Sequence, residues 1–531
     1  MTSAPTRLLR SFATVGGWTM ASRVLGFLRD ILMAAALGSG PVAQAFVVAF
    51  TLPNMFRRFF AEGALNTAFV PMFAKRLEGE GSEEARRFAE DVFSTLAAFL
   101  IGFTLIALLA MPWLVLMLAS GFDDDVRFGL SVVMGRIAFA YILFISLAAM
   151  LSGVLNSLGR FAAAAAAPVL LNIILIGALL LAESGVLKET VRLGGFEGSD
   201  LDGLHHGTLL VWGVVLAGIA QMALVWVAAR RAGLPVFPRL PRITPELKRL
   251  AIIAFPAALA AGVMQINIVV GRQVASYFDG ALAWLWFADR VYQLPLGVVG
   301  VAIGVVLLPE LARRVRAEDP AGANEAMNRA AEFALILTVP ATAALIAIPG
   351  LICAVLYQYG AYTAADTRAT GLALAVYAAG LPAFVLQKII QPAYFAREDT
   401  RTPLNFALVS MVVNVVVAVG AAPLIGFLAA ALGTTLAGWA NLALLWRGVR
   451  RLDAEICIDA RLAKRMPRIV AASIAMGGVV ATLAWAQAEW VPDLRIPAFI
   501  GIVAVGMAVY AALAVLTGAF RPSDLRASLR R

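Results

Sequence analysis

Two apolar segments near the N-terminus carry many charged residues. Residues 13–37 and 41–75 are each long enough to span a bilayer, yet they contain Arg23, Arg29, Asp30, Arg57, Arg58 and Glu62. An ionised side chain at the centre of a membrane costs about 2.5 kcal/mol or more, so such residues normally face a protein interior or a watery cavity. Four of the six are arginines, whose planar, permanently charged guanidinium groups suit phosphate and carboxylate oxygens. The pattern predicts a membrane transporter with a cationic cavity for an anion.

Helical spacing gives these charges a geometry. Arg23 and Asp30 are seven residues apart and share nearly one helical face, whereas Arg29 points about 100° away. Arg58 and Glu62 are four residues apart, which is close enough for the two side chains to pair. In an alternative, purely structural interpretation, the charges pair within the helix bundle and Arg23 extends to the cytoplasmic surface. Pairing alone would leave excess positive charge, because the carboxylates are fewer than the arginines.

The second half of the chain places charges in a similar way. Residues 281–312 carry Asp289 and Arg290, and residues 249–275 end near Arg272. If the first two apolar segments of each half meet, one cavity collects the substrate-binding candidates Arg23, Arg29, Asp30, Arg57, Glu62, Asp289 and Arg290. Three further basic residues either face the same cavity or serve only the packing of the bundle: Arg58, Arg272 and Lys388.

The composition is that of a membrane protein. Of 531 residues, 61% are hydrophobic and 14% are charged, and the mean hydropathy is +0.85. The net charge of +10 resides in short connections between apolar segments, as expected of cytoplasmic loops, so we expect no nucleic-acid partner. The chain has no P-loop and no HExxH motif, and Cys353 and Cys457 form no ligand spacing, which predicts neither an enzyme nor a cofactor or metal site. His205 and His206 fall in a segment that reads as a polar loop.

Apolar windows of about 20 residues predict an all-α polytopic protein with fourteen transmembrane helices. The windows are 13–37, 41–75, 88–119, 127–156, 161–182, 207–229, 249–275, 281–312, 326–348, 368–395, 403–422, 425–447, 467–487 and 496–519. Lys and Arg follow the second, sixth, eighth, tenth and twelfth spans, whereas Asp123, Asp124 and Asp125 follow the third. This asymmetry places both termini in the cytoplasm, which requires an even number of spans.

The chain contains an internal repeat with a period of 220 residues. Gly218, Gln221, Trp226, Arg230 and Arg231 recur at identical spacing as Gly438, Asn441, Trp446, Arg450 and Arg451. The repeat predicts two six-helix halves related by an axis along the membrane normal, an arrangement that transporters use for alternating access. We assign the halves to residues 1–231 and 249–451, a cytoplasmic linker to 232–248, and two additional transmembrane helices to 452–531.

Three stretches resemble the MurJ (MviN) lipid II flippases of the MOP exporter superfamily. They are SRVLGFLRDILMAAALG (residues 22–38), LPNMFRRFFAEGALNTAFVPMF (52–73) and DRVYQLPLGVVGVAIGVVLLPELAR (289–313). The fourteen-helix layout also fits, so the resemblance covers nearly the whole chain. The RRxFAEGA core of the second stretch is its most specific part.

The resemblance implies a multi-pass protein of the bacterial cytoplasmic (inner) membrane. It would move lipid II, the undecaprenyl-diphosphate-linked disaccharide-pentapeptide, from the inner to the outer leaflet for peptidoglycan synthesis. The cavity arginines of the family map onto Arg23, Arg29, Arg57 and Arg290, and the two extra helices would form a hydrophobic groove for the polyprenyl tail. Sodium coupling, suggested for some members through acidic ligands, is disfavoured because residues 249–275 and 403–446 contain no carboxylate. Coupling to another ion or to the membrane potential stays open.

Other functions were weighed against this one. A MATE-like multidrug or cation antiporter shares the duplicated plan but should have twelve helices and an acidic cavity. An exporter of another polyprenyl-diphosphate-linked sugar would use the same cationic chemistry. A scaffold without transport activity would leave the charges at bilayer depth unexplained. The expected partners are lipid II and membrane lipids, and we expect a monomer.

Overall fold

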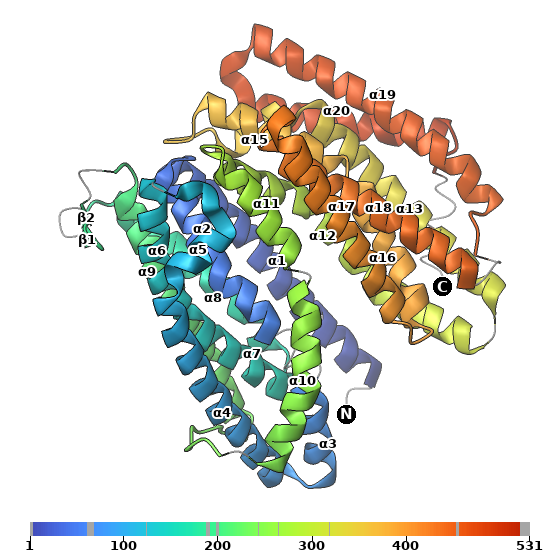
Figure 1. The fold of residues 1–531 in the computed structure, drawn as a ribbon. Coiled ribbons are helices and arrows are strands. Elements are labelled where there is room, and N and C mark those ends of the chain that lie inside the picture. The colour runs from blue at the N-terminus through green and yellow to red at the C-terminus, as the bar shows by residue number, and fades with distance from the viewer. Residues whose placement is uncertain are drawn as a thin grey trace. The chain divides into compact units, whose positions relative to one another are not determined.

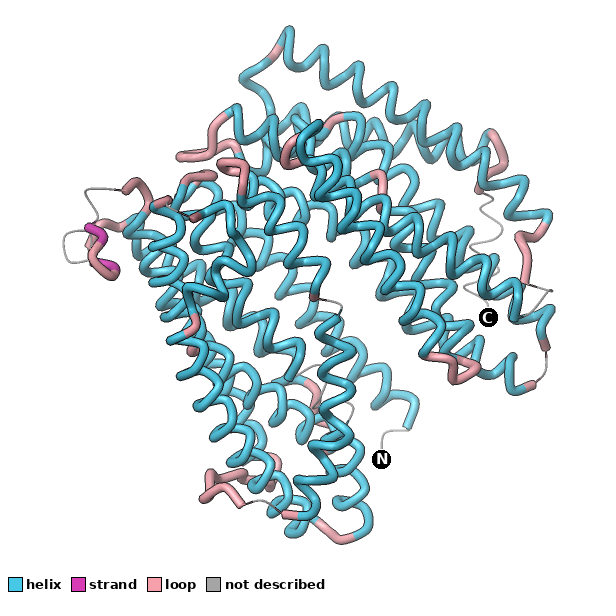
Figure 2. Tube along the Cα trace, viewed as in Figure 1, coloured by secondary structure: helices cyan, strands magenta, loops and turns pink. Residues whose placement is uncertain are grey.

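The computed structural model describes residues 4–60, 68–123, 125–186, 192–197, 201–242, 244–263, 265–317, 319–452 and 456–520. The described chain is helical apart from turns and one antiparallel hairpin, β1 (Arg192–Leu193) and β2 (Phe196–Glu197) (Figures 1 and 2). It forms two compact units. The first unit contains Met1–Ala283 and Tyr359–Tyr362, and the second contains Trp284–Gln358 and Thr363–Arg531.

The first unit is built from helices that pack both on their sequence neighbours and on helices further along the chain. It contains α1 (Ala4–Leu37), α2 (Pro41–Arg57), α3 (Val70–Gly79), α4 (Ser82–Leu109), α5 (Met111–Ala119), the 3₁₀ helix η2 (Ser120–Phe122), α6 (Val126–Phe139), α7 (Tyr141–Ser157), α8 (Ala162–Glu183), α9 (Leu204–Arg231), α10 (Pro245–Val263) and α11 (Ile266–Ser276). Helix α8 packs on α9 and on α1, α2 packs on α6, and α7 packs on α9. The rings of Phe69, Phe73 and Phe88 stack in one part of its core.

The second unit contains α12 (Ala281–Arg316), α13 (Pro320–Ala347), α14 (Pro349–Tyr357), α15 (Ala364–Ala378), α16 (Leu381–Phe395), α17 (Arg401–Ile425), α18 (Leu428–Leu452), α19 (Ala460–Trp490), η3 (Pro492–Leu494) and α20 (Arg495–Leu516). Helices α17 and α18 pack along each other, and α16 packs on α18. The last two long helices are added to one side of this bundle, with α19 on α13 and α20 on α19 (Figure 1).

The packing of the second unit repeats that of the first. Helix α7 lies on α4 and α9 as α16 lies on α13 and α18, and α8 lies on α9 as α17 lies on α18. The breaks also correspond. Helix α4 ends at Leu109 and α5 continues with Pro112 in its first turn, while α13 ends at Ala347 and α14 begins at Pro349. Proline breaks a helix because it lacks a backbone N–H and clashes with the preceding turn.

Within the described residues, ten helical stretches are long and apolar enough to cross a membrane. They coincide with ten of the predicted spans, from 88–119 to 207–229 and from 326–348 to 496–519. The other four predicted spans are the first two of each half. Helix α1 carries three charged residues in its apolar part, α2 has 17 residues, and parts of α10 and α12 have side chains outside the described set. The chain is therefore an all-helical polytopic membrane protein.

Helix α11 belongs to the first unit, although the sequence division assigns it to the second half. Ser120 N–H donates to the Gln273 side chain at 3.0 Å, and Gly121 N–H donates to Ser276 Oγ at 3.0 Å. A Cβ at Gly121 would lie 2.6 Å from the backbone carbon of Ser276. This close approach, which needs a glycine, holds α11 against η2 at the end of α5.

A buried glutamate holds the chain that follows the sixth predicted span, and we call this arrangement the first clamp. The Glu90 carboxylate on α4 is inaccessible and binds Arg86 at 2.6 Å and Arg239 at 2.5 Å. It also accepts a hydrogen bond from the Phe237 backbone, while Ser94 Oγ accepts one from the Arg239 backbone. The segment after α9 is therefore fastened to α4.

The second unit has an equivalent arrangement, which we call the second clamp. Glu332 on α13 is 4% exposed and forms ion pairs with Arg329 of its own helix and with Arg461 and Arg465 of α19. Asp459, the N-cap of α19, also pairs with Arg329. Each unit thus uses one buried carboxylate, on α4 or on α13, to hold the chain that follows α9 or α18.

The assignment of His205 and His206 to a loop is wrong. Gly203 adopts a left-handed conformation with φ of 81°, and α9 begins at the next residue, so both histidines lie in its first turn. His205 is buried, and His206 Nε2 lies 3.2 Å from Glu183 at the end of α8. The surrounding segment is polar, as loops usually are, so the sequence alone did not indicate that a helix begins here.

Candidate functional site

A buried ion pair on α1 forms the centre of the arginine set in the first unit. Arg29 and Asp30 are 7% and 1% exposed. Arg29 Nη2 and Nε donate to Asp30 Oδ1 at 2.7 and 3.1 Å, and Nη1 donates to Asn172 Oδ1 on α8 at 3.0 Å. Asn172 Nδ2 donates to the Ser22 carbonyl at 2.8 Å. The ion pair and the amide therefore tie α1 to α8.

The contact between Arg29 and Asp30 differs from the geometry predicted for α1. Adjacent helical residues diverge by about 100°, but the long Arg29 side chain bends until its guanidinium reaches the neighbouring carboxylate. Arg23 was expected on the face of Asp30, yet Arg23 is exposed while Asp30 is buried. Helical periodicity places Cβ atoms, and it does not determine where a flexible side chain ends.

The environment of Arg29 suits binding of a second anion. A guanidinium has five N–H donors, of which the described partners occupy three. Asp30 balances the charge, which reduces the large cost of burying an isolated cation. Two N–H groups are left without a partner among the described residues, and they can donate charge-assisted hydrogen bonds to a phosphate.

Arg57 lies near the same centre, on a different helix. It is the last residue of α2 and is half-buried. Both Arg57 and Arg29 are close enough to Tyr141, at the start of α7, to interact with it electrostatically. Tyr141 is buried and donates a hydrogen bond to Gln221 at 3.2 Å. The structure thus places Arg29 and Arg57 within electrostatic range of one buried tyrosine.

The structure describes the secondary candidates Arg58 and Arg272, but it does not describe Glu62, the predicted partner of Arg58. Arg58 is exposed and its Nη1 donates to Gln265, at the start of α11, at 3.2 Å. Glu62, its predicted partner, lies outside the described residues, so the pairing stays a prediction. Arg272 lies on α11 and is half-buried.

The candidates of the second unit lie on α12 and α16. The guanidinium carbon of Arg290 lies 4.2 Å from the centre of the Trp286 ring, a cation–π contact that holds the side chain across one helical turn. Gln293 donates a hydrogen bond to Asp289. Lys388 on α16 is exposed. Arg29, Asp30 and Arg57 belong to the first unit and Asp289 and Arg290 to the second, so their common cavity stays a prediction.

Three supporting residues were missed from the sequence, namely Asn172, Tyr141 and Trp286. Asn172 had a recognisable signal, because it is the one polar side chain of residues 162–182 and such residues in membrane helices are generally functional or buried in protein. The two aromatic residues had none, since aromatic residues are common in apolar segments. Within the described residues, no group of three or more His, Cys, Asp or Glu is placed to hold a metal ion.

Comparison with known proteins identifies the family. Residues 33–500 match the sequence profile of the family described as "Lipid II flippase MurJ". The "Probable lipid II flippase MurJ" of Rhizobium meliloti is 45% identical over 536 residues, covering 99% of this chain and 96% of that protein. The protein of the same description from Rhizobium tropici is 42% identical, covering 99% and 97%. The "Lipid II flippase MurJ" of Burkholderia cenocepacia is 32% identical, covering 84% of each chain.

Solved structures show the same fold. A structure described as "Lipid II flippase MurJ, inward closed conformation" superposes with a TM-score of 0.78 at 22% identity, covering 97% of this chain and 99% of that one. An inward-facing MATE transporter of the MOP superfamily gives a TM-score of 0.66 at 14% identity, covering 82% and 95%. The MATE likeness concerns the fold alone. The family profile and the 42–45% identity over nearly the whole chain show that this chain is a transporter and not an enzyme, and that it belongs to the lipid II flippase MurJ family.

Proposed function

We propose that this protein is a lipid II flippase of the bacterial cytoplasmic membrane. It moves the undecaprenyl-diphosphate-linked disaccharide-pentapeptide from the inner to the outer leaflet. Family membership supports the substrate. The observation that carries the mechanism is the position of the buried Arg29. Asp30 and Asn172 hold its guanidinium in place, and two further N–H groups of the guanidinium can donate to a diphosphate.

The proposed architecture has fourteen spans. Residues 1–231 and 249–451 form two six-helix halves related by an axis along the membrane normal, residues 232–248 link them in the cytoplasm, and residues 452–531 add two helices. The ten apolar helices support this division, as does the matching packing of α4 to α9 and of α13 to α18. Both termini lie in the cytoplasm, supported by the basic loops on the same side.

The substrate-binding residues are those that the sequence pattern selects. The diphosphate is bound by Arg23, Arg29, Arg57 and Arg290, with Asp30, Glu62 and Asp289 as acidic neighbours that position them. The hydrogen bonds between Arg29 and Asp30 support this role, because they hold the guanidinium in one orientation before substrate arrives. Less of the arginine's side-chain freedom then has to be lost on binding. Arg58, Arg272 and Lys388 act in a secondary role.

The polyprenyl tail stays in the membrane and lies against α19 and α20. An apolar cavity of about 340 Å³ in the second unit supports this placement. It lies between α13, α16, α18 and α19, and its lining includes Leu386, Trp446 and Leu462. Helices α19 and α20 have no counterpart in the repeat, which leaves them available for the tail.

Transport proceeds by alternating access of the two halves as a monomer. The arginines bind the diphosphate from the cytoplasmic side, and movement of the halves exposes it to the outside. An interior-negative potential favours outward movement of anionic charge by about 2.3 kcal/mol per charge per 100 mV. The membrane potential can therefore help to drive outward movement of the headgroup without a sodium site.

The experiment measures how much lipid II is exposed on the outer leaflet of cells depleted of this protein. Wild type should restore exposure, whereas Arg29→Ala should insert into the membrane normally and fail to restore it. Arg447→Ala removes an exposed arginine near the C-terminal end of α18 and should restore exposure as wild type does. Unchanged exposure after depletion, with no other flippase present, would refute the substrate. Full activity of Arg29→Ala would refute the arginine mechanism.

A further inference from the structure

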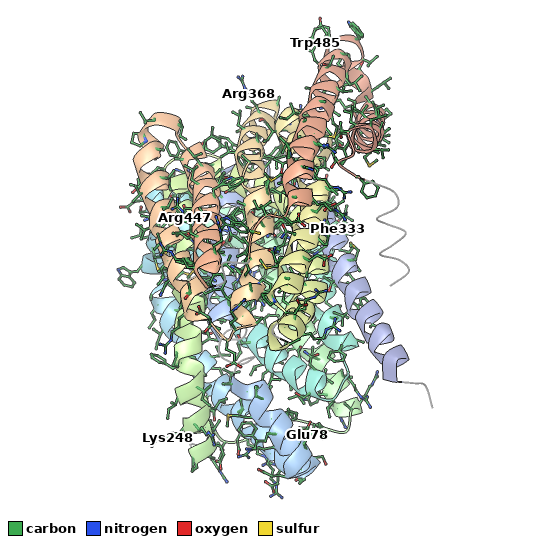
Figure 3. The ribbon with its side chains drawn as sticks, turned by 90° about the vertical axis from the view of Figure 1, so that its right-hand side faces the viewer. Glu78, Lys248, Phe333, Arg368, Arg447 and Trp485 are labelled. Atoms are coloured by element: carbon green, nitrogen blue, oxygen red, sulfur yellow. The ribbon has the colours of Figure 1, made fainter. Side chains whose placement is uncertain are left out.

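The second unit contains a cavity of about 590 Å³ at the end of the bundle away from the second clamp. The break between α13 and α14 forms one wall, α15 forms another, and the last turns of α19 with the start of α20 form a third. Figure 3 shows Arg368 and Trp485, which both line it, near one end of this unit, with Phe333 and Arg447 further from that end. No residue assigned above to lipid II transport lines this cavity.

The charged residues of this cavity are all positive. Arg368 on α15 and Arg495 at the start of α20 line it, and the lining contains no aspartate or glutamate. Neither arginine forms an ion pair or donates a hydrogen bond to any residue in the described ranges, whereas Arg127, Arg329 and Arg465 elsewhere in the chain do. Both side chains are exposed, and two arginines that share one cavity without a counter-ion in its lining can bind an anion.

The start of α14 adds to this positive potential. Ile348, Pro349 and Gly350 line the cavity, so the first turn of α14 opens into it. The N-terminal end of a helix carries a partial positive charge and unpaired N–H groups, which favour anions. Gly371 on α15 makes this placement possible, since a Cβ there would lie 3.2 Å from the Gly350 nitrogen.

The rim of the cavity has the character of a membrane interface. Trp485 is 62% exposed and Leu372 is 48% exposed, and both line the cavity. Tryptophan is enriched at the level of lipid headgroups, where one part of the ring is apolar and another is hydrated. An anion bound beside such a rim can be attached to a hydrocarbon chain, which would lie along the exposed apolar faces of α19 and α20.

We propose that this cavity binds the phosphate-bearing headgroup of a membrane lipid, with Arg368, Arg495 and the start of α14 holding the phosphate oxygens. The shared chemistry has two sources, a bilayer phospholipid such as phosphatidylglycerol and a polyprenyl diphosphate. The topology given under the proposed function places the cavity at the outer leaflet, where the second source would be the transported lipid after translocation. The binding site itself rests only on the residues that line the cavity.

The test uses the full-length protein purified in detergent, with lipid binding measured by native mass spectrometry. The probes are phosphatidylglycerol, undecaprenyl diphosphate, diacylglycerol as an uncharged control, and inorganic phosphate as a competitor. The variants are Arg368→Gln with Arg495→Gln, and the matched control pair Arg447→Gln with Arg450→Gln, which removes two exposed arginines outside the cavity.

We expect the cavity pair to weaken binding of at least one anionic lipid by about fivefold for each arginine removed. The control pair and diacylglycerol binding should be unchanged, and Arg368→Lys with Arg495→Lys should restore part of the affinity. The lipid whose binding falls identifies the source. Unchanged binding of both anionic lipids would overturn the proposal. Displacement of lipid by inorganic phosphate at equal concentration would also overturn it, because the cavity would then be a site for free phosphate.

Since Arg29 and its neighbours are intact in the cavity variants, failure of this proposal is distinguishable from failure of the flippase assignment. The lipid II exposure assay reports on the transport function separately. Loss of lipid II exposure in Arg29→Ala with unchanged lipid binding to the cavity variants would refute the cavity and keep the flippase.

Discussion

Asp30→Asn tests whether the buried carboxylate balances the charge of Arg29. The substitution removes the negative charge while keeping one side-chain oxygen that can accept a hydrogen bond from Arg29. Breaking a buried ion pair by removing one partner destabilises a protein by about 3–5 kcal/mol, and the retained acceptor favours the lower value. In a large protein each kcal/mol lowers Tm by roughly 2 °C, so we expect a drop of roughly 6 °C or more.

The same substitution should strengthen binding of the diphosphate, because asparagine keeps an acceptor that orients the Arg29 guanidinium and removes only the negative charge. A carboxylate about 5 Å from a bound phosphate repels it by roughly 3 kcal/mol at an effective dielectric constant of 20, and this repulsion disappears in the variant. A ligand that binds more tightly stabilises the folded state more at equal concentration. Undecaprenyl diphosphate should therefore raise the Tm of Asp30→Asn more than that of wild type.

The assay is thermal unfolding of the purified protein with and without undecaprenyl diphosphate, together with lipid II exposure in cells. Glu80→Gln is the matched control, because Glu80 is an exposed carboxylate that follows α3. Exposure of lipid II should fall in Asp30→Asn, since a diphosphate held more tightly is released more slowly. A variant as stable as wild type, or one that the diphosphate stabilises less, would refute the role given to Asp30.

Three further predictions concern other parts of the chain. Glu90→Gln should destabilise the first clamp by about 1–3 kcal/mol, because the partly exposed Arg86 and Arg239 lose their buried counter-ion. Proteolysis within residues 232–244 should become faster, and an unchanged rate would contradict the clamp. Trp286→Leu removes the cation–π contact with Arg290, which is worth about 0.5–2 kcal/mol, and should therefore reduce transport modestly. Lipid II exposure equal to that of wild type would contradict the idea that transport depends on how Trp286 orients Arg290. Hydrogen bonds from the Thr402 backbone and side chain hold the pKa of Asp399 below its ordinary value. This turn should therefore be stable above about pH 4 and loosen as the pH falls through the lowered pKa, and protection of the Thr402 amide from exchange at pH 6 and at about pH 2 measures the loss. Equal protection at both values would contradict it.

The long apolar helices could be predicted from the sequence because their signal is local. A run of about 20 apolar residues identifies a membrane helix without knowledge of its neighbours. The helix that begins at Leu204 was placed three residues too late for a different reason. Its first residues, including His205, look polar, and only the left-handed Gly203 shows where the helix begins.

The candidate site could be predicted in its residue types but not in its contacts. The arginines stood out because charge is rare at bilayer depth. The bond between Arg29 and Asn172 joins residues 143 positions apart, and no pattern along the chain indicates which helices meet. The pairing of Arg29 with Asp30 depends on how one long side chain bends, which helical spacing does not specify.

The 220-residue repeat was visible in the sequence, and the structure explains its glycines. A Cβ at Gly218 would lie 2.7 Å from the Tyr141 ring, and a Cβ at Gly438 would lie 2.9 Å from the Phe384 ring. Each glycine makes room for an aromatic ring of a neighbouring helix in the same unit. The repeated glycines thus allow the same kind of close helix packing in both units.

The two clamps bear on how a duplicated protein could have arisen. Each half carries its own glutamate, Glu90 or Glu332, for fastening the chain that leaves its sixth span. An ancestral unit with such a carboxylate would have secured its own exit segment, whatever that segment was attached to. Joining a second copy, and later two more helices, would then have required no change inside either unit. In the first unit that segment leads to α10, and in the second unit it leads to α19, so the same kind of contact would have come to serve two different extensions.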